Sequence, residues 1–515
     1  MRAVWGSRRW QVVAAITALS AVLHLWKLGQ RPLAHDEAID AFFSWQARSG
    51  GVMEYDPVYH GPLRFYLEGA VLRWVGTGAF EARLVAATAG IVATALIASA
   101  RSVLGRVGAP MAGLVFAVSP TVLTVTRTGR EDSLVVLCGV ALLLLVAHAL
   151  TAPRPAHLVA AGALLAATFA LKETAFLLCL NVVVFLALMG VVAVIWDGRC
   201  RAAFRRVGAL GTQPWLWCVM SFALVFMAVY TSGFRYAGGL ESGMFDGVRY
   251  WWGQHDVGRG GQPSFFYLAI YGAYEWLAVG LAAVGLVATV RRRSLVGAWF
   301  AAIGIGHVVL FSWAGEKFAW LAVHPLVPLI LLGGLGAQAI ADRVEGTAWA
   351  KVPAAVGAAL LVLTGFVAVR PAVTDGADPR ELLVTVQTSV DVPPLATRLR
   401  EARADGTIES IVVDQKGGGA WPWSWYLHGV DDVGFASLDP ADLPTDYDAI
   451  VLLADGDPPE VPEGYRLERF RLREWWVPDY DAASMGDLAR WFFTREVWSP
   501  TASADQWLLI REGGS

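Results

Sequence analysis

The chain has 515 residues, of which 56% are hydrophobic and 17% are charged, and its formal net charge at pH 7 is −3. Soluble proteins contain about 45–50% apolar and about 25% charged residues, so soluble domains could not bury this much apolar surface. The composition also excludes a disordered, coiled-coil or collagen-like chain, and the charge gives no support for nucleic-acid binding. We predict a polytopic α-helical membrane protein.

Eleven segments are apolar and long enough to cross the hydrocarbon core of a bilayer, which is about 30 Å thick. The predicted spans are residues 10–28, 80–100, 109–126, 133–151, 157–171, 174–196, 214–231, 265–290, 295–313, 318–340 and 351–370. The first lacks a cleavage site and is expected to be retained as a span. Because several spans are joined by short turns, the expected number is about eleven.

The distribution of basic residues predicts how the spans are oriented. With the N-terminus in the cytoplasm, the short segments on the inner side carry fifteen basic and only three acidic residues. This asymmetry follows the positive-inside rule. It predicts a multi-pass protein of the plasma membrane with two long outer loops, residues 29–79 and 232–264, and an extracytoplasmic C-terminus.

The C-terminal part of the chain has a different pattern. Short apolar runs alternate there with helical stretches and turn clusters, and none is long enough to span a bilayer. The candidate strands are residues 382–386, 411–413, 449–453 and 507–510, and the candidate helices are residues 395–404 and 485–493. This alternation predicts a small α/β domain. We therefore expect a membrane domain over residues 1–370 and a soluble external domain over residues 371–515.

Charged side chains at membrane depth are costly, so those outside the cytoplasmic loops are candidates for function. They form five clusters at the predicted outer ends of the spans: His35-Asp36-Glu37, the loop around His60, Arg130-Glu131-Asp132, Lys172-Glu173, and Glu316-Lys317 with the nearby His324. Each cluster alone has an ordinary explanation, such as a solvated helix start, a polar turn, a packing histidine or a long side chain that reaches the interface. Their position on one side of the membrane favours a common site.

The residue types in these clusters suit the transfer of a group from a lipid phosphate. Arg130, Lys172 and Lys317 would neutralise the phosphate, and a nearby carboxylate would take a proton from an incoming hydroxyl as general base. The acids and a histidine would instead, or also, hold a divalent cation. The sequence has no P-loop, GxGxxG or HExxH motif, so no nucleotide cofactor is expected.

In these residues the chain resembles the GT-C membrane glycosyltransferases. The resemblance is to the branch of protein O-mannosyltransferases and lipid A aminoarabinose transferases, and within it to the flippase-associated mannosyltransferase group. Asp36-Glu37 after the first span is similar to the family's Asp-Glu motif. The other matching stretches are Arg130-Glu131-Asp132, Lys172 in Leu-Lys-Glu-Thr, Gly315 to Pro328, and Trp421-Pro-Trp-Ser-Trp-Tyr426 after a glycine run.

The resemblance implies a polyprenyl-phosphate sugar donor and transfer of a hexosyl or pentosyl group, with inversion, to a lipid, glycan or protein acceptor of the bacterial cell envelope. Asp36 would be the base or position the acceptor, and Glu37 would support it. Residues expected to support the site or contact the acceptor are His35, His60, Glu131, Asp132, Glu173, Glu316 and His324. Candidate metal ligands are Asp36, Glu37, Asp132 and His324, and the need for a metal stays open. Asp40, one turn beyond Asp36, is expected on a solvated face.

Two other classes of protein are alternatives to an enzyme. A glycolipid flippase or transporter typically shows paired half-repeats and broken helices at the membrane midplane, whereas here the charges lie at one edge and no internal duplication is visible. An accessory subunit of envelope glycan export would have a decayed site, whereas these clusters are intact. The sequence therefore favours a glycosyltransferase.

Overall fold

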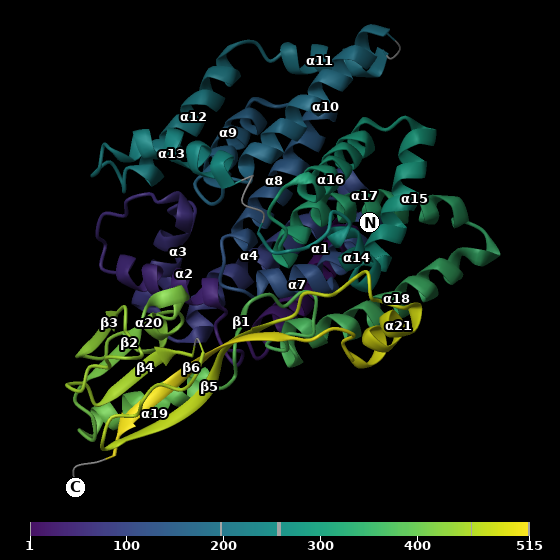
Figure 1. Cartoon of the computed structure of the whole chain (residues 1–515). Coiled ribbons are helices and arrows are strands. Elements are labelled where there is room, and N and C mark those ends of the chain that lie inside the picture. The colour runs from purple at the N-terminus through teal and green to yellow at the C-terminus, as the bar shows by residue number, and fades with distance from the viewer. Residues whose placement is uncertain (1, 196–197, 255–258, 455, 513–515) are drawn as a thin grey trace.

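The structure is a computed structural model, and it describes residues 2–195, 198–254, 259–454 and 456–512. The predicted span 174–196, the predicted loop 232–264 and the predicted external domain each include residues outside these ranges. Figure 1 shows two parts: a large helical part formed by the first three quarters of the chain, and a smaller part built around a β-sheet at the C-terminus.

The helical part contains eighteen α-helices among the described residues. They are α1 (Arg2–Leu25), α2 (His35–Ala47), α3 (Leu63–Trp74), α4 (Ala79–Ser99), α5 (Arg101–Leu104), α6 (Gly108–Val118), α7 (Pro120–Thr126), α8 (Asp132–Thr151), α9 (Pro155–Phe169), α10 (Ala175–Ile195), α11 (Gly198–Gly208), α12 (Gln213–Tyr230), α13 (Gly239–Gln254), α14 (Phe266–Tyr274), α15 (Trp276–Arg292), α16 (Leu295–Trp313), α17 (Val323–Val344) and α18 (Lys351–Val369). The first predicted outer loop, residues 29–79, thus holds α2 and α3, and the second, residues 232–264, holds α13 among its described residues.

Seven of the described helices are long and apolar enough to cross a membrane, and there are nine spans if each of two bent helix pairs is one span. A multi-pass helical membrane protein is therefore confirmed, while eleven spans stay a prediction. The remaining two predicted spans correspond to α1, which does not meet the same test, and α9, which is a shorter apolar helix of 15 residues.

The two bent pairs are joined by one buried carboxylate. The chain turns by 62° between α6 and α7 and by 104° between α14 and α15. Glu275, at the second bend, accepts hydrogen bonds from the Ser119 hydroxyl at 2.7 Å and from the Thr121 amide at 2.8 Å, both at the first bend. Since a bend leaves backbone groups without helical partners, this contact both satisfies the first bend and fixes the two pairs to each other.

The C-terminal part is a six-stranded mixed sheet with the order β1-β5-β6-β4-β2-β3. The strands are β1 (Gln387–Thr388), β2 (Ile411–Asp414), β3 (Val433–Ala436), β4 (Ala449–Leu453), β5 (Tyr465–Trp475) and β6 (Ala502–Arg511), and the helices are α19 (Val392–Ala404), α20 (Trp423–Tyr426) and α21 (Met485–Thr494). Strands β3, β2 and β4, at one end of this order, are parallel to one another, and β6, β5 and β1 continue the sheet in antiparallel pairs. Helix α19 packs its apolar side chains on one face of the sheet.

The strand predicted over residues 382–386 is wrong. This run is irregular, and its Leu382 and Leu383 are buried in the core of the helical part together with Tyr274. The apolar pattern of the run therefore comes from burial where the two parts meet. Strands β1, β3 and β5 were not among the predicted strands. β1 has two residues, and β5 contains no continuous apolar run because arginines and glutamates interrupt it.

The C-terminal part docks directly on the first outer loop. Trp425 of α20 is buried against Leu33 and Ala38 at the start of α2. The Tyr426 hydroxyl accepts a hydrogen bond from the Leu33 amide at 2.9 Å, and the Gln387 side chain donates to the Pro32 carbonyl at 3.0 Å. The tryptophan-rich stretch that contains α20 therefore fixes the sheet next to residues 33–38, where the predicted Asp-Glu motif lies.

Candidate active site

The predicted Asp-Glu motif forms the first turn of α2, where the helix dipole favours negative charge. Its two acids have opposite environments. The Glu37 side chain is 0% exposed, whereas the Asp36 side chain is 42% exposed. Adjacent residues on a helix point about 100° apart, so one turn places one carboxylate inside the protein and the other on a cavity wall.

Glu37 is held by basic and backbone donors. Arg83 donates to both of its oxygens, at 2.5 and 2.7 Å, and the Gly129 amide donates at 2.7 Å. The Ala34 amide at 3.0 Å and Arg31 at 3.3 Å complete the set. Burial would raise the pKa of Glu37, but the two arginines outweigh it and lower the pKa below its ordinary value. Glu37 therefore joins α2 to the start of α4 and to the turn before α8.

Asp36 forms an ion pair with Arg130, which comes from the turn between α7 and α8. The Arg130 guanidinium also lies over the ring of Trp320 at 4.6 Å, a cation–π contact that fixes its plane. Burial acts to raise the pKa of Asp36, but the charge of Arg130 outweighs it and lowers the pKa. The Asp36 carboxylate is therefore ionised at neutral pH and remains open to the cavity.

Behind this pair, Glu131 is the centre of a buried charge network. Lys172 donates to Glu131 at 2.7 Å and to both oxygens of Asp132 at 2.7 and 2.8 Å. Arg130 reaches Glu131 at 3.2 Å, and Arg64 lies 3.6 Å away. Both carboxylates are 0% exposed. Their charges are thus compensated by basic side chains from three different segments, as buried charges require.

Two histidines extend the network on opposite sides. His324, near the start of α17, contacts Asp132 at 2.8 Å through Nε2. His60 contacts Glu173 at 2.7 Å through Nδ1 and lies 3.5 Å from Glu131 through Nε2. Burial would lower the pKa of His60, but the carboxylates of Glu131 and Glu173 outweigh it and raise the pKa. The first outer loop is thereby tied to the segments before α8 and α10.

Four of the five predicted clusters therefore meet in one place, and the fifth is divided. His324 joins the network through Asp132, whereas Glu316 and Lys317 form no ion pair among the described residues. The Lys317 ammonium donates to the Ala314 carbonyl at 2.6 Å. The catalytic, phosphate-binding and supporting roles assigned to all these residues stay predictions.

Two adjoining cavities lie above the network. The smaller, about 240 Å³, is lined by Arg31, His35, Asp36, Arg130 and Asp132, together with residues of α7 and the segment 383–387. The larger, about 710 Å³, lies between the helical part and strands β5 and β6. Both cavities are lined by Phe318, Ala319 and residues 384–386, so they share one wall. Asp36 lines the smaller cavity, whereas Lys317 lines the larger.

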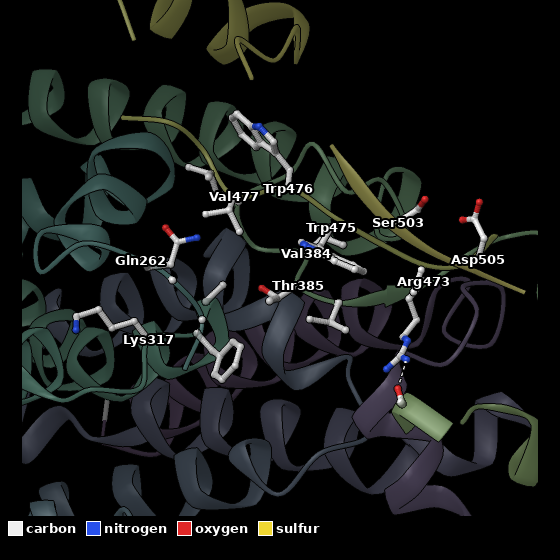
Figure 2. A pocket seen from close by; sticks show the side chains of 18 of the residues that line it. Gln262, Lys317, Val384, Thr385, Arg473, Trp475, Trp476, Val477, Ser503 and Asp505 are labelled. Atoms are coloured by element: carbon white, nitrogen blue, oxygen red, sulfur yellow. Dashed lines mark hydrogen bonds between the residues drawn. The ribbon is translucent and has the colours of Figure 1, made fainter. Parts of the chain in front are cut away.

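The C-terminal part contributes side chains to this region. Arg473 of β5 donates to the His35 ring at 3.1 Å and to the Gly417 carbonyl at 3.0 Å. Figure 2 shows Arg473 reaching from its strand to a hydrogen-bond acceptor, with the ammonium end of Lys317 turned away from Arg473. Gly417 and Gly418 have positive φ angles, and a Cβ on Gly418 would lie 3.4 Å from His35. The glycine run therefore permits a close approach to the residue next to Asp36.

The expectation that Asp40 lies on a solvated face is wrong. Asp40 is buried and accepts a hydrogen bond from Arg64 at 2.8 Å. Its helix face is covered by α3, so a polar residue one turn beyond Asp36 points inward. Arg31, Arg64, Arg83 and Arg473 were not among the predicted site residues. A signal existed for Arg83: it is a basic residue at the outer end of a predicted span, against the positive-inside rule.

The candidate metal ligands do not gather around a common point. Among the described residues, no group of three or more His, Cys, Asp or Glu side chains is placed to hold a metal ion. Glu37 is surrounded by arginine and amide donors, and Asp132 is shared by Lys172 and His324. In this arrangement the four residues do not fit a metal centre.

The comparisons with known proteins agree with this architecture. Residues 59–217 match the family model described as dolichyl-phosphate-mannose-protein mannosyltransferase. ArnT from Cupriavidus metallidurans, bound to undecaprenyl phosphate, is similar in structure with a TM-score of 0.51 and 19% identity, over 81% of this chain and 75% of that one. The Archaeoglobus fulgidus oligosaccharyltransferase, in complex with Zn and sulfate, has a TM-score of 0.54 and 11% identity, over 85% and 67%. No curated protein sequence matches the chain.

These findings confirm the predicted resemblance: the chain shares its fold with these two proteins, and residues 59–217 are similar to the protein mannosyltransferase family model.

Proposed function

We propose that this protein transfers a sugar from a polyprenyl-phosphate donor to an acceptor of the cell envelope, on the external face of the plasma membrane. The observation that carries the proposal is the contrast among the acids around the two cavities. Asp36 is open to the smaller cavity, whereas Glu37, Glu131 and Asp132 are fully buried under basic partners. Of the two acids that line the smaller cavity, Asp36 has an exposed side chain and Asp132 does not. An exposed carboxylate next to an arginine suits one proton transfer and one leaving phosphate.

Asp36 would act as the general base. An acceptor hydroxyl gives up its proton to the Asp36 carboxylate as its oxygen forms a bond to the anomeric carbon of the donor sugar. The bond from that carbon to the phosphate oxygen breaks, and the phosphate leaves with the electron pair. One base and one displacement give inversion at the anomeric carbon. Positioned bases of this kind contribute about 10²–10⁴-fold to rates.

Arg130 would bind the phosphate of the donor. Its guanidinium is fixed over Trp320 and lines the same cavity as Asp36. A planar guanidinium matches phosphate oxygens in pairs, and in a partly dry cavity it stabilises the negative charge that grows on the leaving group. The ArnT structure bound to undecaprenyl phosphate supports a polyprenyl-phosphate ligand for this fold.

The two cavities suggest where each substrate binds. The donor phosphate would occupy the smaller cavity beside Arg130. The acceptor would occupy the larger one, whose walls combine Trp475, Gln262 and Ser503 with the charged pair of Arg469 and Asp505. An aromatic ring with polar groups around it is typical of a site for a polar ligand. The acceptor hydroxyl would then reach Asp36 across the shared wall at residues 384–386.

Metal dependence is tested separately. If a divalent cation assembles the acids into a different arrangement when substrate binds, a chelator abolishes transfer and added Mg²⁺ or Mn²⁺ restores it. Transfer that is unchanged by the chelator supports the base mechanism without a metal.

The deciding experiment is an assay of the purified protein in vesicles with radiolabelled polyprenyl-phosphate sugars and envelope extracts as acceptor. We expect labelled product only when active protein is present. Labelled donor that crosses the bilayer unchanged would instead indicate a flippase, and neither product nor movement would indicate an accessory subunit. The Asp36→Asn variant serves as the matched control, since it keeps the shape of the side chain and removes its basicity.

A further inference from the structure

Helix α21, in the C-terminal part, has two sharply different faces. Its apolar residues are Met485, Leu488, Ala489, Trp491, Phe492 and Phe493, and its polar residues include Asp487, Arg490 and Thr494. At about 100° per residue the apolar set covers one side and the polar set covers the other. The helix starts in a well-formed cap, in which the Ser484 hydroxyl accepts from the Asp487 amide at 3.1 Å.

One edge of the apolar side is already packed against the helical part. Trp491 is buried, with its ring 6.1 Å from that of Tyr274 in α14, and its indole N–H donates to the Arg380 carbonyl at 2.9 Å. Next to it, Arg495 donates to the buried Glu381 at 2.6 Å. These contacts fix the orientation of α21 against the membrane domain.

The rest of the apolar side is open. Met485 is 81% exposed, Phe493 is 75% exposed and Leu488 is 38% exposed. Burial of apolar surface is worth about 25 cal/mol per Å², so three large side chains on one face of a rigid helix indicate a surface that is covered in the membrane-bound protein.

The position of α21 identifies lipid as the cover. Tyr274, which holds Trp491, ends α14, and α14 packs against α18. Near its end α18 exposes Phe366 at 72%, and as a candidate membrane span it presents such residues to lipid. Val367 of α18 and Phe492 of α21 pack against the same buried cluster, and Figure 1 shows both helices in the region where the sheet meets the helical part. The open face of α21 thus continues the apolar surface of the spans to the level at which they leave the bilayer.

We propose that α21 lies in the interface of the bilayer and anchors the C-terminal part to the membrane surface. Met485, Leu488 and Phe493 would enter the boundary between headgroups and acyl chains, to a depth of about 5–10 Å that is typical of such helices. Arg490 and Thr494 would face water and headgroups. Trp476, which contacts Trp491 with ring centroids 6.2 Å apart, follows Arg473 by three residues on the same chain segment. The anchor would therefore hold β5 at a fixed height above the cavities.

The test uses the full-length protein with its four cysteines replaced, and with single cysteines labelled by a fluorophore. Met485→Cys and Phe493→Cys probe the apolar face, and Arg490→Cys and Thr494→Cys are the matched controls on the polar face of the same helix. In vesicles that contain lipids brominated near the headgroup end of the acyl chains, we expect the label to lose emission at the two apolar positions and to keep it at the two polar ones.

Equal emission at all four positions, quenched or not, would overturn the proposal, because it would show that the helix has no preferred face toward lipid. Unquenched labels at Met485 and Phe493 that become protected on protein association would show that a second copy covers the face, which also contradicts it. The measurement needs no substrate, so its result does not depend on the proposed reaction.

Discussion

The cavity-facing pair, Asp36 with Arg130, and the buried network around Glu37, Glu131 and Asp132 are built from the same residue types a few ångströms apart. The difference between them is access. Asp36 has one protein cation and an open side, whereas each buried acid is surrounded by donors from several segments. A charged residue at membrane depth is therefore not by itself evidence of a catalytic role, because most of these acids hold helices together.

The comparison predicts that the two regions respond oppositely to substitution. Changes in the buried network should lower stability, and activity should fall only as folded protein is lost. A change of Asp36 should lower turnover and leave stability nearly unchanged, whereas a change of Arg130 should lower both, because Arg130 also contacts Glu131.

Replacement of Lys172, which contacts both Glu131 and Asp132, should have the largest effect on stability. Lys172→Met leaves Glu131 and Asp132 with one cation fewer in a fully buried place. Breaking a buried pair by removing one partner costs about 3–5 kcal/mol. We expect a strong drop in melting temperature in detergent, measured by differential scanning fluorimetry. If the variant melts like the wild type and only its activity with the donor is lost, Lys172 acts in the cavity and not in the buried network.

A smaller loss is expected at Asp40. Asp40→Asn removes the charge that Arg64 binds and leaves a buried guanidinium less well satisfied, which costs about 1–3 kcal/mol. The same fluorimetry compares it with Asp56→Asn, a change in an exposed part of the first outer loop. If both variants melt at the wild-type temperature, the network does not extend to Asp40.

Lys317 is an intermediate case between the two regions, because it lines a cavity and does not belong to the buried network. Lys317→Met removes a side chain whose described partner is one backbone carbonyl, so stability should change little. The sequence predicts that Lys317 contacts the donor phosphate, in which case loss of one charge-assisted hydrogen bond raises the KM for donor about ten- to a hundredfold. If the acceptor binds in the larger cavity, which Lys317 lines, the KM for acceptor rises instead. Lys27→Met is the control, and equal losses at both lysines would mean general damage.

The pH dependence of stability should reflect the protonation of His60. Its pKa is raised in the folded protein by Glu131 and Glu173, so the folded state binds its proton more tightly than the unfolded state. This contribution is fully present below the ordinary histidine pKa of about 6.5 and is lost as pH rises through the raised value. The melting temperature should therefore fall over that range, and His60→Gln should remove the dependence. A wild-type protein with the same slope as the variant would contradict the assigned contacts.

Much of the membrane domain and of the site could be predicted from the sequence. The apolar runs determine most of the helices, and the outer position of Asp36, Arg130 and Lys172 predicts their convergence. Asp40 shows the limit: a polar residue in an outer loop looks solvated until the fold covers it with α3. Arg473 shows a second limit of prediction from sequence. His35 precedes it by more than four hundred positions, and no local pattern indicates that the two residues are in contact.

The most direct test of the central claim is the paired measurement of turnover and donor binding for Asp36→Asn and Glu37→Gln in the same vesicles. We expect that Asp36→Asn binds donor and melts like the wild type while its turnover falls by about 10²-fold or more. We also expect that Glu37→Gln melts at a clearly lower temperature and keeps, per folded molecule, most of its turnover. Near-normal turnover by Asp36→Asn, or the same pattern in both variants, would contradict the division between the cavity-facing pair and the buried network.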